Sequence, residues 1–191
     1  MDLDEIDKKI ISQLQVDGRT TLEELAKITG FTSMGTKKRL EKLTKSGAIK
    51  VSALINPTAL ELHTAIVLLE MESAEAMQTL IERFIDCPRV INIFKTMGGY
   101  NLFALVVAEN QDMLECIAVE RCSLRNSPGI RRSEFYLIND ICYSPFLQIR
   151  EFLFNKEKTA KHCGVDCNSC GRFEAKKCSG CPTTVNLRVT P

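Results

Sequence analysis

The sequence predicts an α+β protein with a helix-turn-helix at the N-terminus, a ferredoxin-like βαββαβ domain, and a small cysteine-rich metal module at the C-terminus. Apolar residues recur at helical spacing through the first 50 residues, after which strand and helix patterns alternate. Five of the nine cysteines fall in the last 29 residues. The expected parts are residues 1–50, an arm at 51–61, the sheet domain at 62–145, a short helix and linker at 146–161, and the module at 162–191.

Three helices are expected in the first 50 residues. The first carries apolar side chains at helical spacing and ends at Asp17-Gly18; these side chains are Leu3, Ile6, Ile10, Ile11 and Leu14. Thr20 or Thr21 caps the second helix, which Gly30 ends. A third helix begins near Ser33 and ends at Ser46-Gly47. The tight turn between the last two helices makes them a helix-turn-helix.

The middle of the chain alternates between strand and helix patterns in the order β-α-β-β-α-β. The expected strands are residues 64–71, 90–96, 100–108 and 130–142, and the expected helices are 73–86 and 112–124. This order places both helices on one face of a four-stranded antiparallel sheet. The apolar residues of the other face need cover, which predicts a homodimer or a higher homo-oligomer formed through that face. A short amphipathic helix is expected at Phe146 to Phe154.

The composition sets limits on the class of protein. Apolar residues make up 45% and charged residues 26% of a chain with net charge +1, which excludes disorder throughout and a uniformly basic surface. The longest apolar run, residues 102–108, is far shorter than the roughly 20 residues of a membrane span. The acidic N-terminus is unlike a signal peptide. We therefore expect a cytoplasmic protein with no membrane partner.

Basic residues concentrate on the third expected helix and predict double-stranded DNA as a partner. Six lysines and arginines stand between Ser33 and Lys50 against a single acid, Glu41, and such a local field suits phosphates. The exposed N-terminal end of this helix is expected to read base edges with Thr32, Ser33, Met34, Lys37 and Lys38. Backbone phosphates are assigned to Arg39, Lys42 and Lys45. The alternative is a solvated polar helix face.

The cysteine-rich tail predicts a metal site. Cys163, Cys167 and Cys170 have the spacing Cys-x3-Cys-x2-Cys, and Cys178 and Cys181 follow as a second Cys-x2-Cys pair. So short a segment cannot bury a core of its own, so the thiols point to metal binding. Zinc is one candidate, held by the last four of these cysteines. A [4Fe–4S] cluster is favoured, because three closely spaced thiols and a proline after the last cysteine are typical of cluster loops.

The N-terminal motifs resemble the Lrp/AsnC (feast/famine) transcription regulators. The resemblance rests on residues 3–11, Gly30-Phe31-Thr32, residues 37–40, Leu43 and residues 46–50, and it continues to about residue 142. It implies a winged helix-turn-helix joined to an effector and dimerisation domain, in proteins that assemble as dimers or larger oligomers and often bind an amino acid. The cysteine module then adds redox or metal sensing, or, in the alternative, a structural zinc site.

One turn departs from the pattern of this family. Where the family usually has Thr-Gly-x-Tyr/Phe-Asp near its effector pocket, this chain has Met97, Gly98, Gly99, Tyr100 and Asn101. The last four of these are candidate effector-binding residues, while the alternative is that the two glycines only make a tight hairpin. Sirohaem decarboxylases also resemble the family and carry a Tyr-Asn pair here, but they depend on histidines. This chain has only His63 and His162, so we expect no enzyme.

Overall fold

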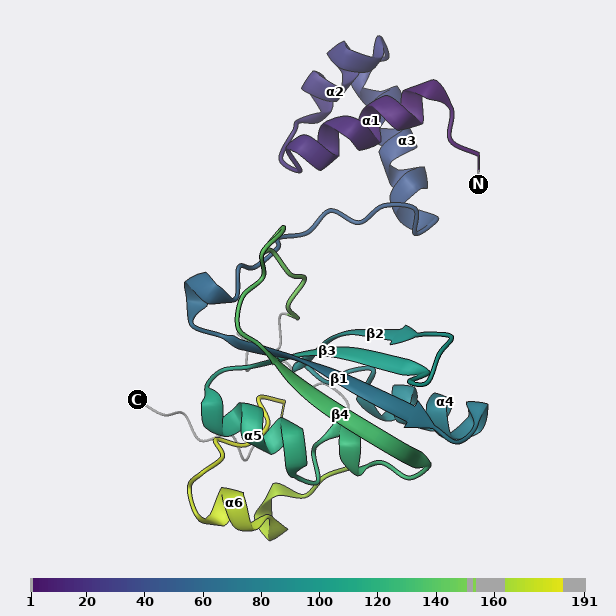
Figure 1. The fold of residues 1–191 in the computed structure, drawn as a ribbon. Helices are drawn as coiled ribbons and strands as arrows, with labels where there is room; N and C mark the ends of the chain where they lie inside the picture. The colour runs from purple at the N-terminus through teal and green to yellow at the C-terminus, as the bar shows by residue number, and fades with distance from the viewer. Residues whose placement is uncertain (1, 151–152, 154–163, 184–191) are drawn as a thin grey trace. The chain divides into compact units, whose positions relative to one another are not determined.

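The computed structural model describes residues 2–150, 153 and 164–183. Within it the chain forms two compact units, Met1–Ala53 and Leu54–Pro191, each with its own hydrophobic core. The first is helical and the second is built on a sheet, as Figure 1 shows. Cys163 and His162 lie outside the described residues.

The helical unit confirms the three predicted helices: α1 (Glu5–Val16), α2 (Leu22–Thr29) and α3 (Ser33–Lys45). Each begins at a side chain that accepts hydrogen bonds from the first turn, namely Asp4, Thr21 and Thr32. Each helix contributes one fully buried residue to the core: Ile10, Leu25 and Leu43. Residues 2–53 contain no strand, so the wing that the family resemblance implies is not formed by strands there.

The second unit confirms the βαββαβ order. Its elements are β1 (His63–Met71), α4 (Ala74–Phe84), β2 (Val90–Lys95), β3 (Leu102–Ala108), α5 (Gln111–Val119) and β4 (Ile130–Ile138). The four strands form one antiparallel sheet in the order β2-β3-β1-β4. Two predicted elements extend more than two residues too far: the last strand ends at Ile138, and the second helix ends at Val119, before a short 3-10 turn at Leu124–Asn126.

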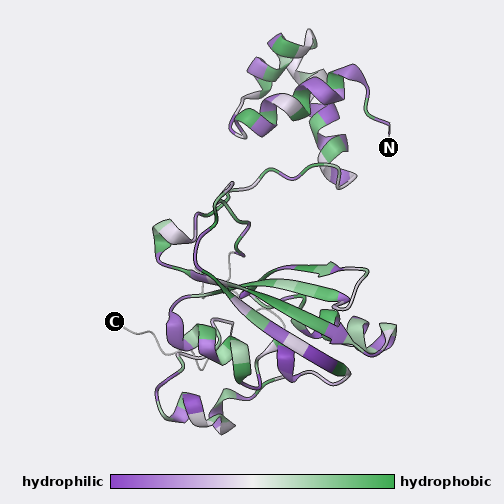
Figure 2. Cartoon of the chain, in the orientation of Figure 1, coloured by the Kyte–Doolittle hydropathy of each residue, from purple (hydrophilic) through white to green (hydrophobic). Residues whose placement is uncertain are grey.

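The two faces of the sheet differ in their cover. Alternate residues of β1 and β3 pack with α4 and α5 into the main core, which includes Val67, Leu69 and Leu102. On the other face a smaller cluster forms around Ile91 and Val107. Hydrophilic residues interrupt β4, whereas most of the sheet is hydrophobic (Figure 2).

The predicted helix at Phe146 to Phe154 is wrong over residues 146–150, where the structure has no helix. Leu147 forms an isolated antiparallel bridge with Ile55, with both backbone hydrogen bonds at 2.8 Å. This pairing satisfies the backbone of Leu147 without a helix and places Ile149 and Leu153 against the sheet. The chain itself therefore covers part of the second face, which sequence reasoning had left entirely to a partner subunit.

Part of that second face stays open. Ile66, Phe94 and Tyr136 are 37%, 51% and 53% exposed on strands β1, β2 and β4. Their registers put them on the same side of the sheet, since Ile66 pairs with Tyr136 across β1 and β4. No helix among the described residues is both long enough and apolar enough to cross a membrane.

Candidate functional site

The surface of α3 carries the residues expected to contact DNA. Met34 is 64% exposed at its N-terminal end, beside exposed Thr32, Ser33, Lys37 and Lys38. Thr32 caps the helix by accepting from the backbone N–H of Gly35 at 3.1 Å. The inward side is apolar or small, with Thr36 and Leu43 buried.

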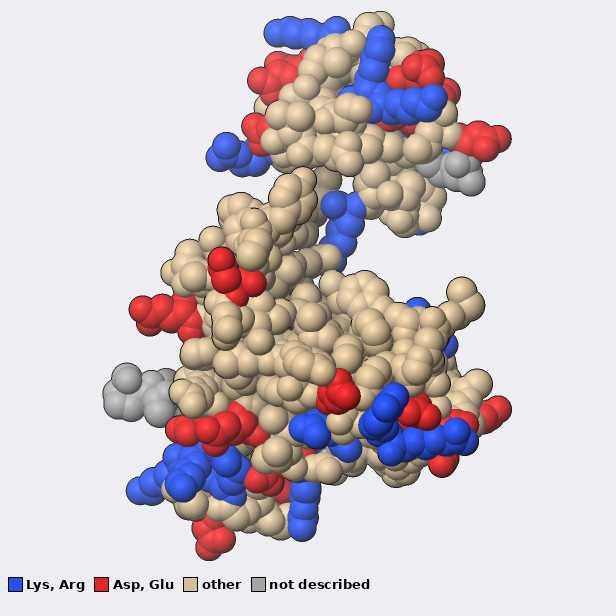
Figure 3. All heavy atoms as spheres, in the orientation of Figure 1, with Lys and Arg blue, Asp and Glu red and all other residues tan. Residues whose placement is uncertain are grey.

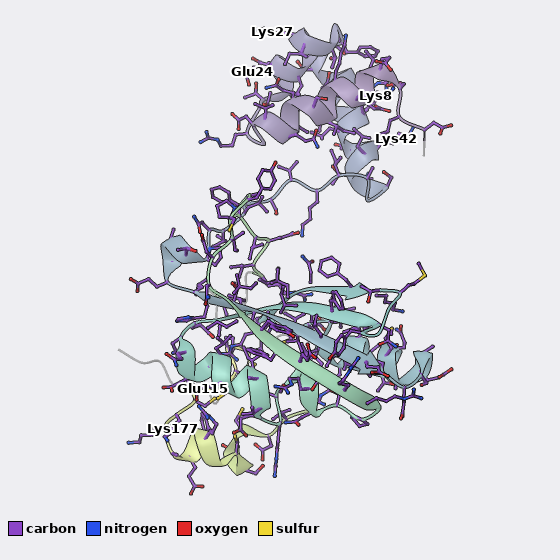
Figure 4. All side chains as sticks on the ribbon, in the orientation of Figure 1. Lys8, Glu24, Lys27, Lys42, Glu115 and Lys177 are labelled. Carbon is purple, nitrogen blue, oxygen red and sulfur yellow. The ribbon has the colours of Figure 1, made fainter. Side chains whose placement is uncertain are left out.

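The lysines of the second half of α3 gather on one side. Lys38, Lys42 and Lys45 lie at i, i+4 and i+7 and line one shallow hollow with Glu41 and Ser46. Figure 4 shows Lys42 on α3, and Lys8 and Lys27 on the other two helices. Glu41 lies 4.0 Å from Lys37, and both side chains of this pair are about half exposed, so the pair contributes little to stability. Because three lysines face a single acid, Glu41, the hollow has a net positive charge, as binding of a phosphate requires.

Arg39 makes contacts within the helical unit that its sequence pattern did not suggest. Its Nη1 donates to Asp4 Oδ2 at 2.6 Å and to Asp7 Oδ1 at 2.9 Å, and its guanidinium lies 5.2 Å from the centroid of the Phe31 ring. The Arg39 side chain is 29% exposed. The backbone N–H of Asp7 and then the Arg39 guanidinium lower the pKa of Asp4. Arg39 thus joins α3 to the start of α1, a long-range pairing that no local sequence pattern signals.

The turn between β2 and β3 is held by Asn101. Its side chain donates to the carbonyl oxygen of Met71 at 2.9 Å and accepts from the Met71 N–H at 2.8 Å. The backbone N–H of Asn101 also donates to the Leu69 carbonyl at 3.1 Å. This side chain therefore extends the pairing of β3 with β1 past the end of the strand. Gly98 and Gly99 form the turn before it.

Tyr100 points to a polar cluster that sequence reasoning missed. Its hydroxyl donates to Glu134, which also accepts from Tyr136, and Arg132 stacks over the Tyr100 ring at 4.4 Å from the centroid. The hydrogen bond from Tyr100 lowers the pKa of Glu134. The available signal was the period-2 spacing of Arg132, Glu134 and Tyr136 on β4, which puts all three on the open face of the sheet.

The described part of the tail packs against α5. It contains a short 3-10 turn, Cys167–Ser169, and a one-turn helix α6, Gly171–Glu174. Arg172 donates to Glu115 at 2.9 Å, and Phe173 is 8% exposed. Figure 1 shows α6 beside α5, and Figure 3 shows basic and acidic side chains interleaved there. The tail is therefore docked on the helix-covered side of the sheet domain.

A buried arginine fixes a second point of the tail. Arg89 forms two hydrogen bonds of 2.8 Å with Glu109 and donates to the carbonyl oxygen of Gly180 at 3.0 Å. Burial lowers the pKa of Arg89, but the Glu109 carboxylate, together with Cys181 and Cys87, raises that pKa overall, so the guanidinium stays charged. A buried charge that also binds a tail carbonyl ties the Cys178–Cys181 segment to the start of β2.

Cysteines of the tail and of the sheet domain line one cavity of about 50 Å³. Cys167, Cys178 and Cys181 come from the tail, while Cys87 and Cys122 come from the sheet domain. No disulfide joins any of the eight cysteines in the described part of the chain. No three His, Cys, Asp or Glu side chains of the described residues are already arranged to hold a metal ion.

Two sulfur interactions distinguish Cys178 within this cavity. The Cys116 thiol donates to Cys178, which lowers the pKa of Cys178 and raises that of Cys116, while burial acts against the shift at Cys178. The backbone N–H of Gly180 also donates to Cys178 Sγ at 3.3 Å. Sequence reasoning assigned the scattered cysteines to the core. That is correct for Cys116, which is 1% exposed, but Cys142 is exposed beyond the last strand.

Comparison with known proteins agrees with both units. A family model described as winged helix-turn-helix DNA-binding matches residues 3–50, and the Lrp/AsnC ligand binding domain matches residues 64–141. The HTH-type transcriptional regulators FL11 of Pyrococcus furiosus and Pyrococcus horikoshii are 33% and 34% identical over 113 residues, which are 59% of this chain and 75% of each relative. The crystal structure of the Mycobacterium tuberculosis leucine response regulatory protein is 26% identical, with a TM-score of 0.65 over 78% of this chain and 100% of that one.

A helix-turn-helix joined to a βαββαβ ligand-binding domain defines a DNA-binding regulator. The chain belongs to the Lrp/AsnC family of transcriptional regulators. The FL11 relatives are named as transcriptional regulators, which favours a regulator over the decarboxylase-like alternative. Neither family model reaches the cysteine-rich tail.

Proposed function

We propose that this regulator reads operator DNA through α3. At the N-terminal end of the helix, base edges in the major groove are read by the exposed residues Thr32, Ser33, Met34, Lys37 and Lys38, and Lys42 and Lys45 hold phosphates. The observation that supports this most directly is the exposed basic side of α3, with Lys38, Lys42 and Lys45 around one hollow. Arg39 holds α3 against the start of α1 through its ion pairs with Asp4 and Asp7, and so contributes to DNA affinity only indirectly.

Selection of bound duplexes from a random DNA pool by the full chain tests this assignment. We expect an enriched sequence with two half-sites, because a dimer presents two copies of α3. Met34→Ala, at the exposed end of α3, is expected to change which bases are enriched while leaving the fold intact. Lys8→Ala is a matched control, since Lys8 lies on α1 and pairs with Glu5 at 2.7 Å. Recovery of no preferred sequence would contradict sequence-specific reading.

The sheet domain is proposed to assemble the regulator and to receive a small molecule. The open apolar residues Ile66 and Phe94 support a homodimer, and further assembly to a higher oligomer, through this face. An amino acid is the effector class proposed for the turn at Gly98, Gly99, Tyr100 and Asn101. The Asn101 side chain is already hydrogen-bonded to the backbone of Met71, so it would shape this pocket rather than bind the effector. A calorimetric screen of the twenty amino acids tests the pocket. If none of them binds, the proposed pocket is refuted.

The tail is proposed to bind a metal centre that modulates DNA binding. The cysteines Cys163, Cys167, Cys170, Cys178 and Cys181 are the tail's candidate ligands, and a [4Fe–4S] cluster is favoured over Zn²⁺. The proposed modulation is supported by the docking of the tail on α5 and at Arg89. Through these contacts a structural change at the metal centre would be transmitted to the sheet domain. Loss or oxidation of the cluster would release this docking and alter subunit geometry or DNA affinity.

Metal analysis with a visible spectrum of anaerobically purified protein tests the tail. About four irons per chain and a broad visible band that air bleaches are expected for the cluster. About one zinc per colourless chain would instead favour the structural zinc alternative, with the amino acid effector as the only signal. Equal affinity of the loaded and metal-free proteins for the selected operator would refute modulation by the tail.

A further inference from the structure

We infer that the metal centre of the tail takes one ligand from the sheet domain, Cys87, beside the tail thiols Cys167, Cys178 and Cys181. This inference rests on the proposed function, since it assumes that the tail binds a metal. It changes the nature of the module, because the metal would then join the tail covalently to the domain on which it is docked.

The geometry of the cavity carries the inference. Of the four tail cysteines in the described residues, three line it, while Cys170 does not. A closed thiolate site for zinc or a cubane cluster needs four ligands. The remaining thiols in the lining are Cys87 and Cys122, both from the sheet domain. Within the described residues, the tail therefore supplies three thiols to this cavity, and the domain supplies candidates for the fourth.

Cys87 suits this role better than Cys122. It lies in the turn between α4 and β2, where its own N–H donates to the Phe84 carbonyl at 3.0 Å and its carbonyl accepts from Val90 at 3.2 Å. These bonds fix its backbone at the rim of the sheet. The Cys122 thiol instead approaches the carbonyl oxygen of Cys116 at 3.8 Å, so it points along its own loop.

Charge in the cavity supports the same ligand set. Arg89 interacts electrostatically with both Cys87 and Cys181, and the Arg89 side chain is 8% exposed. Four thiolates around a divalent ion or a cluster of charge +2 carry a net charge of about −2, which is costly in an apolar cavity. A buried guanidinium that interacts with two of the thiols offsets part of that cost. The N–H of Gly180, which donates to Cys178 Sγ, acts in the same direction.

The ligands need to close on the metal only when it binds. Binding of a metal to a small thiolate module is coupled to the folding of that module, so a fully formed site is not required beforehand. The tail is already held at Arg172 and at Gly180, on either side of Cys178. We therefore expect closure to move the loops that carry Cys167 and Cys181.

Three single variants of the full chain separate this ligand set from a module that uses tail thiols alone. Cys87→Ser removes the inferred ligand, Cys122→Ser removes the other domain thiol of the same cavity, and Cys170→Ser removes the tail thiol outside it. Each reduced, metal-free protein is titrated with Zn²⁺ against a chromophoric chelator and with Co²⁺, whose thiolate charge-transfer band reports the number of bound thiolates. Circular dichroism of the metal-free proteins checks that each variant folds.

We expect Cys87→Ser to weaken Zn²⁺ binding at least tenfold and to reduce the Co²⁺ charge-transfer band, since changes in even the outer shell of a metal site cost about 10–100-fold in affinity. Cys122→Ser and Cys170→Ser should bind like the natural sequence. If Cys87→Ser binds like the natural sequence, the tail supplies all the ligands and the inference is wrong, while the proposed metal function stands. Equal losses in Cys87→Ser and Cys122→Ser would overturn the assignment of Cys87. If the natural sequence binds neither ion, the proposed metal function fails as well.

Discussion

Replacement of Leu43 by alanine tests how the DNA-reading unit is held together. Leu43 is 1% exposed and meets Ile10 and Leu25, both fully buried, so the core of this unit has one central residue from each helix. Removing a buried leucine side chain to alanine costs about 2–5 kcal/mol. A unit of this size seldom has more than about 3–5 kcal/mol of stability. Leu43→Ala should therefore leave the helical unit largely unfolded near room temperature.

The sheet domain has a separate and larger core, so it should stay folded in the same variant. Thermal unfolding followed by far-ultraviolet circular dichroism, together with amide hydrogen exchange resolved along the chain, measures both units at once. Met34→Ala on the same helix is the matched control, because this side chain is 64% exposed and its loss should change the free energy of unfolding by less than about 0.5 kcal/mol. Protection of residues 5–45 in Leu43→Ala equal to that of the natural sequence would refute this description of the core.

Two further predictions concern single interactions. Asn101→Ala should destabilise the sheet domain by about 1–3 kcal/mol in chemical denaturation, because it leaves both the N–H and the carbonyl of Met71 without their side-chain partner; a loss no larger than that of the exposed control Gln78→Ala would mean that the turn tolerates the change. The helical unit should lose stability as the pH falls below about 4. The folded pKa of Asp4 is lowered, so its contribution is complete above the unfolded pKa of about 3.9 and is lost as the pH falls through the folded pKa. Melting curves from pH 7 to pH 2 measure this loss, and an Asp4→Asn variant with an equally steep acid loss would contradict it.

Local signals predicted most of the fold. Helix ends followed from side chains that cap neighbouring N–H groups, as at Thr21 with Glu24, where both halves of a capping box form. Strands β1 and β3 followed from apolar runs of the right length. The predicted helix after Pro145 failed because its apolar spacing fits two solutions. The pairing of Leu147 with Ile55, more than 90 residues earlier in the chain, decided between them.

The candidate sites were predictable only as far as they are local. The exposed lysines of α3 follow from one helix and its period, so the sequence located them. The binding of Arg39 to Asp4 and Asp7 joins residues more than 30 positions apart, and no local pattern reports it. The same holds for Cys87 and Cys122, which the sequence presents as single cysteines. Only the docking of the tail on α5 brings them to the same cavity as Cys178.

The salt dependence of operator binding tests the central claim, that α3 holds DNA phosphates with its lysines. The logarithm of the association constant of the full chain for its selected duplex should fall linearly with the logarithm of salt concentration. Lys42→Ala should make that slope shallower by about 0.9 for each phosphate that is no longer neutralised, or about 1.8 for a dimer. Lys8→Ala on α1 should leave the slope unchanged (Figure 4). Equal slopes for the natural sequence and for Lys42→Ala would contradict the assignment of Lys42 to a phosphate.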